Sequence, residues 1–257
     1  MALTTRLSQA TFAVAMLGLG ALSAIYGGAA LLWQAVPKTL PARAVLIYLC
    51  AAVLLAGGAG LLVRRTAAIA RGVLLLFLAL WLVALKLPPL LRAPGVAVNW
   101  ESLAEVAVML AGCACLHTAR APAGAPPVAT RAGRLLLVAA LPMIGASHFA
   151  YAALTASLVP AWLGAPLVWA YLTGAASIAA AAGLLFGVLP RLAATLEAAM
   201  LWIITLLVWV PRFVTTPADQ EVSTEFFISS AIAAGAWVVA GTYRQAPWGP
   251  RRRGVPR

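Results

Sequence analysis

The stretch from Arg43 to Val63 reads RAVLIYLCAAVLLAGGAGLLV, one continuous apolar run behind a single basic residue. A run of about 20 apolar residues is long enough to cross the hydrocarbon core of a bilayer as a helix. Further runs of this kind follow along the chain, separated by proline, glycine and charged residues. The sequence therefore predicts eight membrane-spanning helices, approximately at residues 10–31, 43–63, 66–87, 100–118, 134–156, 165–187, 191–211 and 224–242.

The composition of the whole chain leads to the same class of protein. Of its 257 residues, 64% are hydrophobic and 9% are charged, and the mean hydropathy is +0.99. A soluble domain carries about 25% charged residues, so a water-soluble globule is excluded. The apolar runs are continuous, whereas the strands of a membrane barrel alternate between apolar and polar residues. The expected fold is an all-α membrane protein.

The two halves of the chain resemble each other in sequence. Tyr48 aligns with Tyr171 at a shift of 123 residues. Arg65 aligns with Arg191 at a shift of 126, and Glu101 with Glu225 at a shift of 124. We interpret this as a tandem duplication of a four-helix module, with a first repeat at 1–120, a linker at 121–133, a second repeat at 134–243 and a basic tail at 244–257. Because four spans is an even number, both repeats enter the membrane from the same side and are parallel.

The basic residues predict the orientation in the membrane. Of the 18 Lys and Arg residues, 13 fall on one predicted side and 5 on the other. An excess of Lys and Arg marks the cytoplasmic side, so both chain ends are expected in the cytoplasm. The net charge of +12 then reflects topology and contact with anionic lipid. The lipid bilayer is the expected partner, and nucleic acid is not.

A recurring pattern of small residues and turns identifies the module. One helix ends near Val-Pro, the next ends in Gly-x-Gly-Leu-Leu or Ala-Gly-Leu-Leu, and a third opens with Arg-x-Ala-Ala after a basic turn. In the second half the segments are Ser147-His148-Phe149, Val159-Pro160-Ala161-Trp162, Tyr171-Leu172-Thr173-Gly174 and Arg191-Leu192-Ala193-Ala194. This pattern resembles the DoxX family of four-helix inner-membrane proteins, with the first half as a more distant copy. The resemblance implies a bacterial inner-membrane protein near the quinone pool, since the family is named for subunits associated with thiosulfate:quinone oxidation.

The fifth span contains the clearest candidate for ligand binding. His148 lies in its outer half, and Tyr151 is on the same helical face. We expect both to face the interior, with Tyr171 lining the same cavity, where they could hold a quinone carbonyl or another amphiphile. The simpler alternative is a histidine that a neighbouring helix satisfies, which is a packing role. The other histidine, His117, lies at the opposite end of its span, so no haem, metal site or other cofactor is predicted.

Two glutamates stand one turn apart at the outer start of the fourth span. Paired carboxylates such as Glu101 and Glu105 can form an acid–base or cation site. The simpler interpretation is that acids favour the first turn of a helix because of its dipole, with Asn99 as the cap. Thr224 and Glu225 repeat this arrangement at the start of the eighth span.

One acid falls inside a predicted span, about 9 Å from its cytoplasmic end. This is Glu197, and a shift of 126 residues pairs it with Arg71. Equivalent positions around a twofold axis lie at the same depth, and an unpaired charge there is costly. We therefore predict an ion pair between Arg71 and Glu197 that links the two halves. The competing outcomes are that Arg71 reaches the lipid head groups, or that Glu197 pairs with another arginine.

Two functions agree with these features. The first is an accessory or redox-linked protein near the quinone pool, which binds a quinone or assists a partner membrane protein. The second is a binding or carrier module for a small hydrophobic or amphiphilic molecule. Carriers usually have broken helices and buried polar groups, of which the sequence shows few, so transport is the less favoured function. No catalytic constellation is visible, and whether the protein is an enzyme stays open.

Overall fold

The computed structural model describes residues 3–27, 39–119 and 126–249. The end of the first predicted span (28–31), residues 121–125 of the predicted linker and residues 250–257 of the basic tail lie outside these ranges. The α-helices are α1 (Leu3–Tyr26), α2 (Arg43–Leu62), α3 (Ala67–Trp81), α4 (Leu87–Arg92), α5 (Ala97–His117), α6 (Val128–Ala150), α7 (Ala152–Leu158), α8 (Pro166–Leu185), α9 (Pro190–Ile204), α10 (Val210–Thr215) and α11 (Gln220–Gly241). Between them lie two π-helical turns, η1 (Leu82–Lys86) and η3 (Thr205–Trp209), and one 3₁₀ turn, η2 (Ala161–Leu163).

Within the described ranges, eight helical segments are long and apolar enough to cross a membrane. Two of these segments run through a π-turn: Ala67–Arg92 joins α3, η1 and α4, and Pro190–Thr215 joins α9, η3 and α10. The predicted all-α fold with eight such helices is confirmed. α6 begins at Val128, directly after Pro127, so residues 128–133 of the predicted linker are helical.

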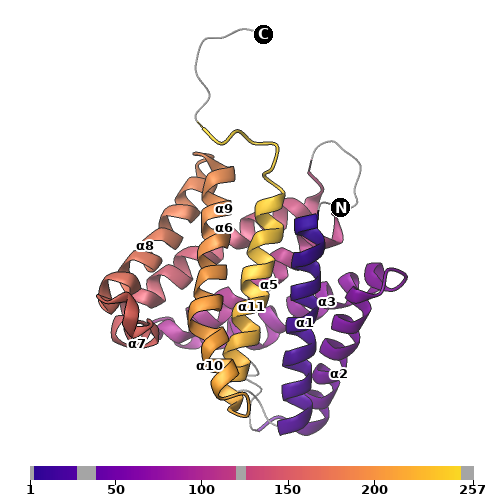
Figure 1. The fold of residues 1–257 in the computed structure, drawn as a ribbon. Helices are drawn as coiled ribbons and strands as arrows, with labels where there is room; N and C mark the ends of the chain where they lie inside the picture. Colours follow the sequence, from indigo (N-terminus) through magenta and orange to yellow (C-terminus); the bar gives the residue numbers. More distant parts are fainter. Residues whose placement is uncertain (1–2, 28–38, 120–125, 250–257) are drawn as a thin grey trace.

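The helices of the two halves, residues 3–119 and 126–249, interlock. At the centre, α5 packs on α11, and these two spans are the most buried. α1 packs on α2 and α11, and α6 packs on α8 and α5. α3 packs on α5, and α9 packs on α11. The first helix of each half therefore packs on the last helix of the other half (Figure 1). The eight spans form one body and not two separate four-helix bundles.

The α5–α11 contact depends on two glycines. A Cβ atom on Gly112 would overlap the Cα atom of Gly235, and one on Gly235 would lie 2.9 Å from the carbonyl oxygen of Val108. Any larger residue at either position would push the two backbones apart. Small residues allow this close approach in membrane helices, where packing replaces the hydrophobic effect as the driving force.

Four successive pairs of corresponding elements in the two halves lie at one constant interval. The bounds of α2 and α8, of α3 and α9, of η1 and η3, and of α4 and α10 all differ by 123 residues. Ala42, before α2, and Ala165, before α8, both have a left-handed backbone, with φ of 54° and 42°. Non-glycine residues rarely adopt this conformation. A rare backbone feature as well as the helix bounds therefore recurs after 123 residues.

A π-helical turn interrupts one span in each half. The N–H groups of Leu87 and Val210 bond to the carbonyl group five residues back, which is the π-helical pattern. Pro88 and Pro211 follow directly. Proline lacks an N–H group, and its ring clashes with the carbonyl four residues before it, so a wider turn avoids the clash. The regular α-helical hydrogen bonding is interrupted at these two turns, although both spans stay helical throughout.

Candidate functional site

The η1 turn carries a lysine into the interior of the molecule. Lys86 is the last residue of η1 and is only 3% exposed. Its Nζ atom donates a hydrogen bond to Ser102 Oγ on α5 over 2.6 Å. Ionisable side chains inside membrane spans are costly and usually functional. No role was predicted for Lys86, whose charge counts towards the outer side, although it lies inside the predicted span 66–87, directly before Leu87-Pro88-Pro89.

Three glutamates lie near this lysine. Glu105 on α5 and Glu225 on α11 interact electrostatically with Lys86, and Glu101 interacts with both acids. All three glutamates are partly buried. We call the group of Lys86, Ser102 and these three acids the Lys86 cluster. Its one positive and three negative formal charges favour a ligand group that is cationic or donates hydrogen bonds.

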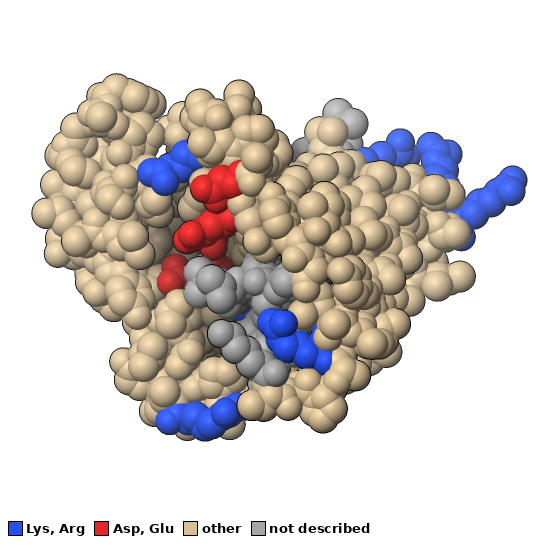
Figure 2. Space-filling view, turned by 90° about the horizontal axis from the view of Figure 1, so that it is seen from below, with Lys and Arg blue, Asp and Glu red and all other residues tan. Residues whose placement is uncertain are grey.

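Five of the six acidic residues gather on the face opposite the start of α1 and the end of α11 (Figure 1). Figure 2 shows them in a row near the middle of this face, between larger areas without charge. Five acids of the sequence lie in the first three turns of α5 and α11 or directly before them: Glu101, Glu105, Asp219, Glu221 and Glu225. The start of two central helices therefore concentrates negative charge at one end of the molecule.

The predicted cap of the fourth span by Asn99 is wrong, and the cap of the eighth span is a residue that was not predicted. α5 begins at Ala97 without a side-chain cap, and the Asn99 side chain instead donates to the carbonyl groups of Pro89 and Ala93. Glu101 is the fifth residue of α5 and so lies beyond its first turn. The helix dipole acts mainly within the first turn, so it does not account for Glu101 and Glu105. On α11 the cap is Asp219, which accepts hydrogen bonds from two backbone N–H groups.

The η3 turn also places a polar side chain against a central helix. Thr205 is buried, and its hydroxyl donates to the carbonyl group of Leu201 over 2.9 Å. The hydroxyl of Ser229 on α11 lies 2.7 Å from Thr205 Oγ1, so Ser229 is the donor in this pair. In both halves, a buried side chain on the π-turn thus bonds to a serine on the adjacent central helix.

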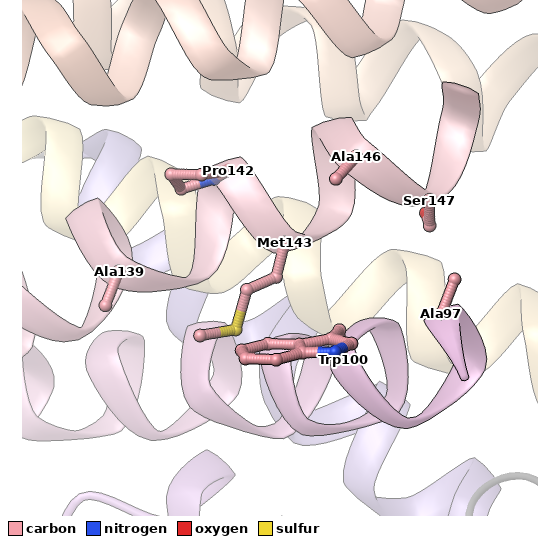
Figure 3. A pocket seen from close by; sticks show the side chains of 7 residues that line it. All are labelled: Ala97, Trp100, Ala139, Pro142, Met143, Ala146 and Ser147. Atoms are coloured by element: carbon pink, nitrogen blue, oxygen red, sulfur yellow. The ribbon is translucent and has the colours of Figure 1, made fainter. Parts of the chain in front are cut away.

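A pocket of about 380 Å³ opens between α5 and α6. Figure 3 shows its apolar wall, where the Met143 side chain of α6 extends towards the Trp100 ring of α5. Ser147 lines the pocket and lies within hydrogen-bonding reach of Glu101. The pocket therefore connects an apolar surface to the Lys86 cluster.

The three residues predicted to bind a ligand contact three different neighbours. His148 Nδ1 lies 2.8 Å from Thr173 Oγ1 on α8, which agrees with a packing role. Tyr151 Oη accepts a hydrogen bond from the Val98 N–H at the start of α5 over 3.2 Å. Tyr171 is 45% exposed and stacks on a phenylalanine at the surface. The 380 Å³ pocket is not lined by any of the three, and ligand binding by them stays a prediction.

The ion pair predicted between Arg71 and Glu197 is not formed in the described structure. Arg71 Nε and Nη1 donate to the carbonyl groups of Ala67 and Leu116, over 2.9 and 2.8 Å. Glu197 Oε1 accepts a hydrogen bond from Ser177, and Oε2 has no hydrogen-bond partner. The predicted register was wrong, because α3 and α9 are 123 and not 126 residues apart. The helices also pack on different central helices, α3 on α5 and α9 on α11.

Comparison with known proteins gives one partial match. A family model described as a domain of unknown function (DUF8561) matches residues 137–219, from α6 to the residue before α11. No curated protein and no solved structure matches the chain.

In the described ranges, no group of three or more His, Cys, Asp or Glu side chains is arranged to hold a metal ion.

Proposed function

We propose that the chain is a multi-pass membrane protein that binds, and carries, a small amphiphilic molecule. The head group of this ligand contacts the Lys86 cluster, and its apolar part occupies the pocket between α5 and α6. The pair of π-turns carries the proposal, because each turn sets a buried polar side chain against a central helix. Carriers built from repeats bind their substrates where interrupted helices meet near the interface between repeats.

The proposal includes two parallel repeats in one membrane protein. The constant interval of 123 residues supports a duplication, and so does the recurrence of the π-turns and of the left-handed residues before α2 and α8. Each repeat has four spans, which makes the two repeats parallel. The central contact of Gly112 with Gly235, also 123 residues apart, then lies near the pseudo-twofold axis between them.

The chemistry of the cluster favours a ligand that is cationic or donates hydrogen bonds. A quinone head group offers only carbonyl acceptors. The donors at the pocket are already engaged, because Trp100 Nε1 donates to the carbonyl group of Pro94 and Ser147 Oγ to that of Ile144. Glu101 beside the pocket supplies acceptors. An alkyl amine or a similar amphiphile therefore fits this arrangement better than a quinone.

The quinone-linked function is the second proposal. It rests on the resemblance to the DoxX family, which also supports a bacterial inner membrane and a partner membrane protein. The two proposals differ in what the pocket binds. A ligand with a donor group supports the first, and a quinone that competes for the same pocket supports the second.

The excess of basic residues on one side supports cytoplasmic chain ends, which places the Lys86 cluster in the outer half of the membrane. A reporter that is active only outside the cytoplasm tests this orientation. Fused after Arg257 it should be inactive, and fused after Pro94, between α4 and α5, it should be active. The opposite pattern would reverse the orientation.

A pair of brominated probes tests the binding proposal on the purified full chain in detergent. Bromine quenches tryptophan fluorescence, so a bromododecylammonium ion that binds in the pocket should quench Trp100. The Trp100→Phe variant should lose this quenching. Bromododecanol, which has the same chain without the charge, should bind more weakly.

The decisive variant is Glu101→Gln, which keeps the shape of the side chain and removes its charge. It should weaken binding of the ammonium probe roughly tenfold, because a hydrogen bond to a charged group contributes about 1.5–3 kcal/mol. Glu221→Gln, which changes an exposed acid on α11, should have little effect. Equal binding of the two probes, or preferential displacement by decylubiquinone, would contradict the proposal.

A further inference from the structure

A second buried acid lies far from the Lys86 cluster. Glu197 is the eighth residue of α9 and is only 2% exposed. Ser177 on α8, which is also buried, donates a hydrogen bond to Glu197 Oε1 over 2.9 Å. Both residues belong to helices long and apolar enough to cross a membrane. The carboxyl group therefore lies in the interior of the second half, away from water.

The other carboxyl oxygen is unsatisfied. Glu197 Oε2 is buried and has no hydrogen-bond partner. An ionised carboxylate is stable in such a place only when cations or several donors compensate its charge, because the apolar surroundings solvate it poorly. A carboxyl group that carries a proton on Oε2 avoids most of this cost.

No described charged group on the elements packed against α9 lies beside Glu197. The titratable side chain of α8 is Tyr171, which is exposed and stacked on Phe149. The titratable groups of α11 are Glu221 and Glu225, near its start. The hydroxyl groups of Thr205 and Ser229 are in contact, so these two residues lie at the same height along the helix axes. Glu197 lies eight residues from Thr205, and Glu225 lies four residues from Ser229 in the opposite direction. Glu225 is therefore about 18 Å from Glu197 along the helix axes.

The remaining charge on α9 itself is engaged elsewhere. The Arg191 guanidinium group lies over the Trp248 ring, 3.9 Å from its centroid, and donates to the carbonyl group of Ala246. It is directed towards the segment that follows α11 and away from the carboxyl group. η3, the other element packed on α9, consists of Thr205–Trp209 and carries no charged residue.

We propose that Glu197 is a proton-binding site within the second half. The carboxylate takes one proton from a hydronium ion at Oε2: one O–H bond of hydronium breaks as the carboxyl O–H bond forms, and a water molecule remains. On release, the carboxyl O–H bond breaks and the proton returns to a water molecule, which becomes hydronium again. Ser177 holds the other oxygen and so fixes the orientation of the carboxyl group. This site does not depend on amphiphile binding at the Lys86 cluster, and each can fail without the other.

The proton site belongs to one half only. At the interval of 123 residues, Glu197 corresponds to Leu74, which is fully buried and apolar. Glu197 lies eight residues before Thr205, on the span that the η3 turn interrupts. Proton binding therefore takes place on the same span as one of the two π-turns, where it can influence the packing of α9 on α8.

Infrared spectroscopy of the purified full chain tests the proposal. At neutral pH, an un-ionised carboxyl group gives a C=O stretching band outside the amide region, and the band shifts in heavy water. Glu197→Gln should remove this band, and Glu221→Gln should leave it unchanged. The Ser177→Ala variant should keep the band and move it to higher frequency, because the carbonyl oxygen loses its donor.

The serine variant also covers the case in which Glu197→Gln does not fold, because it removes only a hydroxyl group. A spectrum that Glu197→Gln leaves unchanged would overturn the proposal. So would a band that Ser177→Ala does not shift. Loss of the band in the first variant together with the shift in the second would establish Glu197 as the proton-binding group.

Discussion

The ammonium group of Lys86 donates a hydrogen bond to the Ser102 hydroxyl over 2.6 Å, and this bond joins a π-turn to a central helix. It places a positive charge between acids of α5 and α11. Lys86 is the last residue of the π-turn, and its side chain is buried, with only 3% exposed. The bond therefore links the interruption of the span to the chemistry of the candidate site.

Ser102→Ala should lower stability. The variant leaves the buried ammonium group without its hydroxyl acceptor, which costs about 1.5–3 kcal/mol for a hydrogen bond to a charged group. Unfolding by sodium dodecyl sulfate in mixed micelles measures the change. Ser157→Ala, which alters an exposed serine, is the control. Equal stability of the two variants would show that the Lys86–Ser102 bond contributes nothing.

Gly112→Ala should also destabilise the protein, by about 1–3 kcal/mol, because the added methyl group overpacks the closest contact of α5 and α11. Gly241→Ala is the matched control, since a Cβ atom there has nothing within 4 Å. The same unfolding measurement applies. A Gly112 variant as stable as the Gly241 variant would mean that the two central helices do not pack as described.

Pro211→Ala should convert the η3 turn towards a regular α-helix. Alanine supplies an N–H group and removes the ring clash, so the reason for the wider turn disappears. Thr205 would then rotate away from Ser229. Cysteines introduced at these two positions should form a disulfide when Pro211 is present and do so more slowly in the alanine variant. Equal rates of disulfide formation would show that the proline does not maintain the turn.

His148→Phe should cost about 1 kcal/mol or less. The variant loses the hydrogen bond to Thr173, and such bonds between membrane helices average about 0.6 kcal/mol. The bromododecylammonium assay should give the same affinity as the native chain. A large loss of affinity would instead identify His148 as a ligand-binding residue.

The candidate site could be predicted only in part. The sequence singled out Glu101 and Glu105 but explained them by the helix dipole, because helix starts cannot be located to within a turn from hydropathy. It assigned no role to Lys86, although the predicted span 66–87 contains this residue, because hydropathy does not show whether a lysine near the end of a span points inwards or towards the head groups. The pairing of Arg71 with Glu197 assumed a shift of 126 residues between the two halves, three more than the observed interval of 123. Matches of Ala and Leu do not fix this shift in so apolar a chain.

The sequence by itself determined that the protein is all-α with eight helices long enough to cross a membrane. This property is local: each helix satisfies its own backbone hydrogen bonds, so length and hydropathy suffice to recognise it. The tertiary structure alone decided that α1 packs on α11 and α6 on α5, that Lys86 faces Ser102, and that Glu197 has Ser177 as its partner. These contacts depend on the rotation of each helix and on its neighbours, and the π-turns change the rotation in a way that hydropathy does not register.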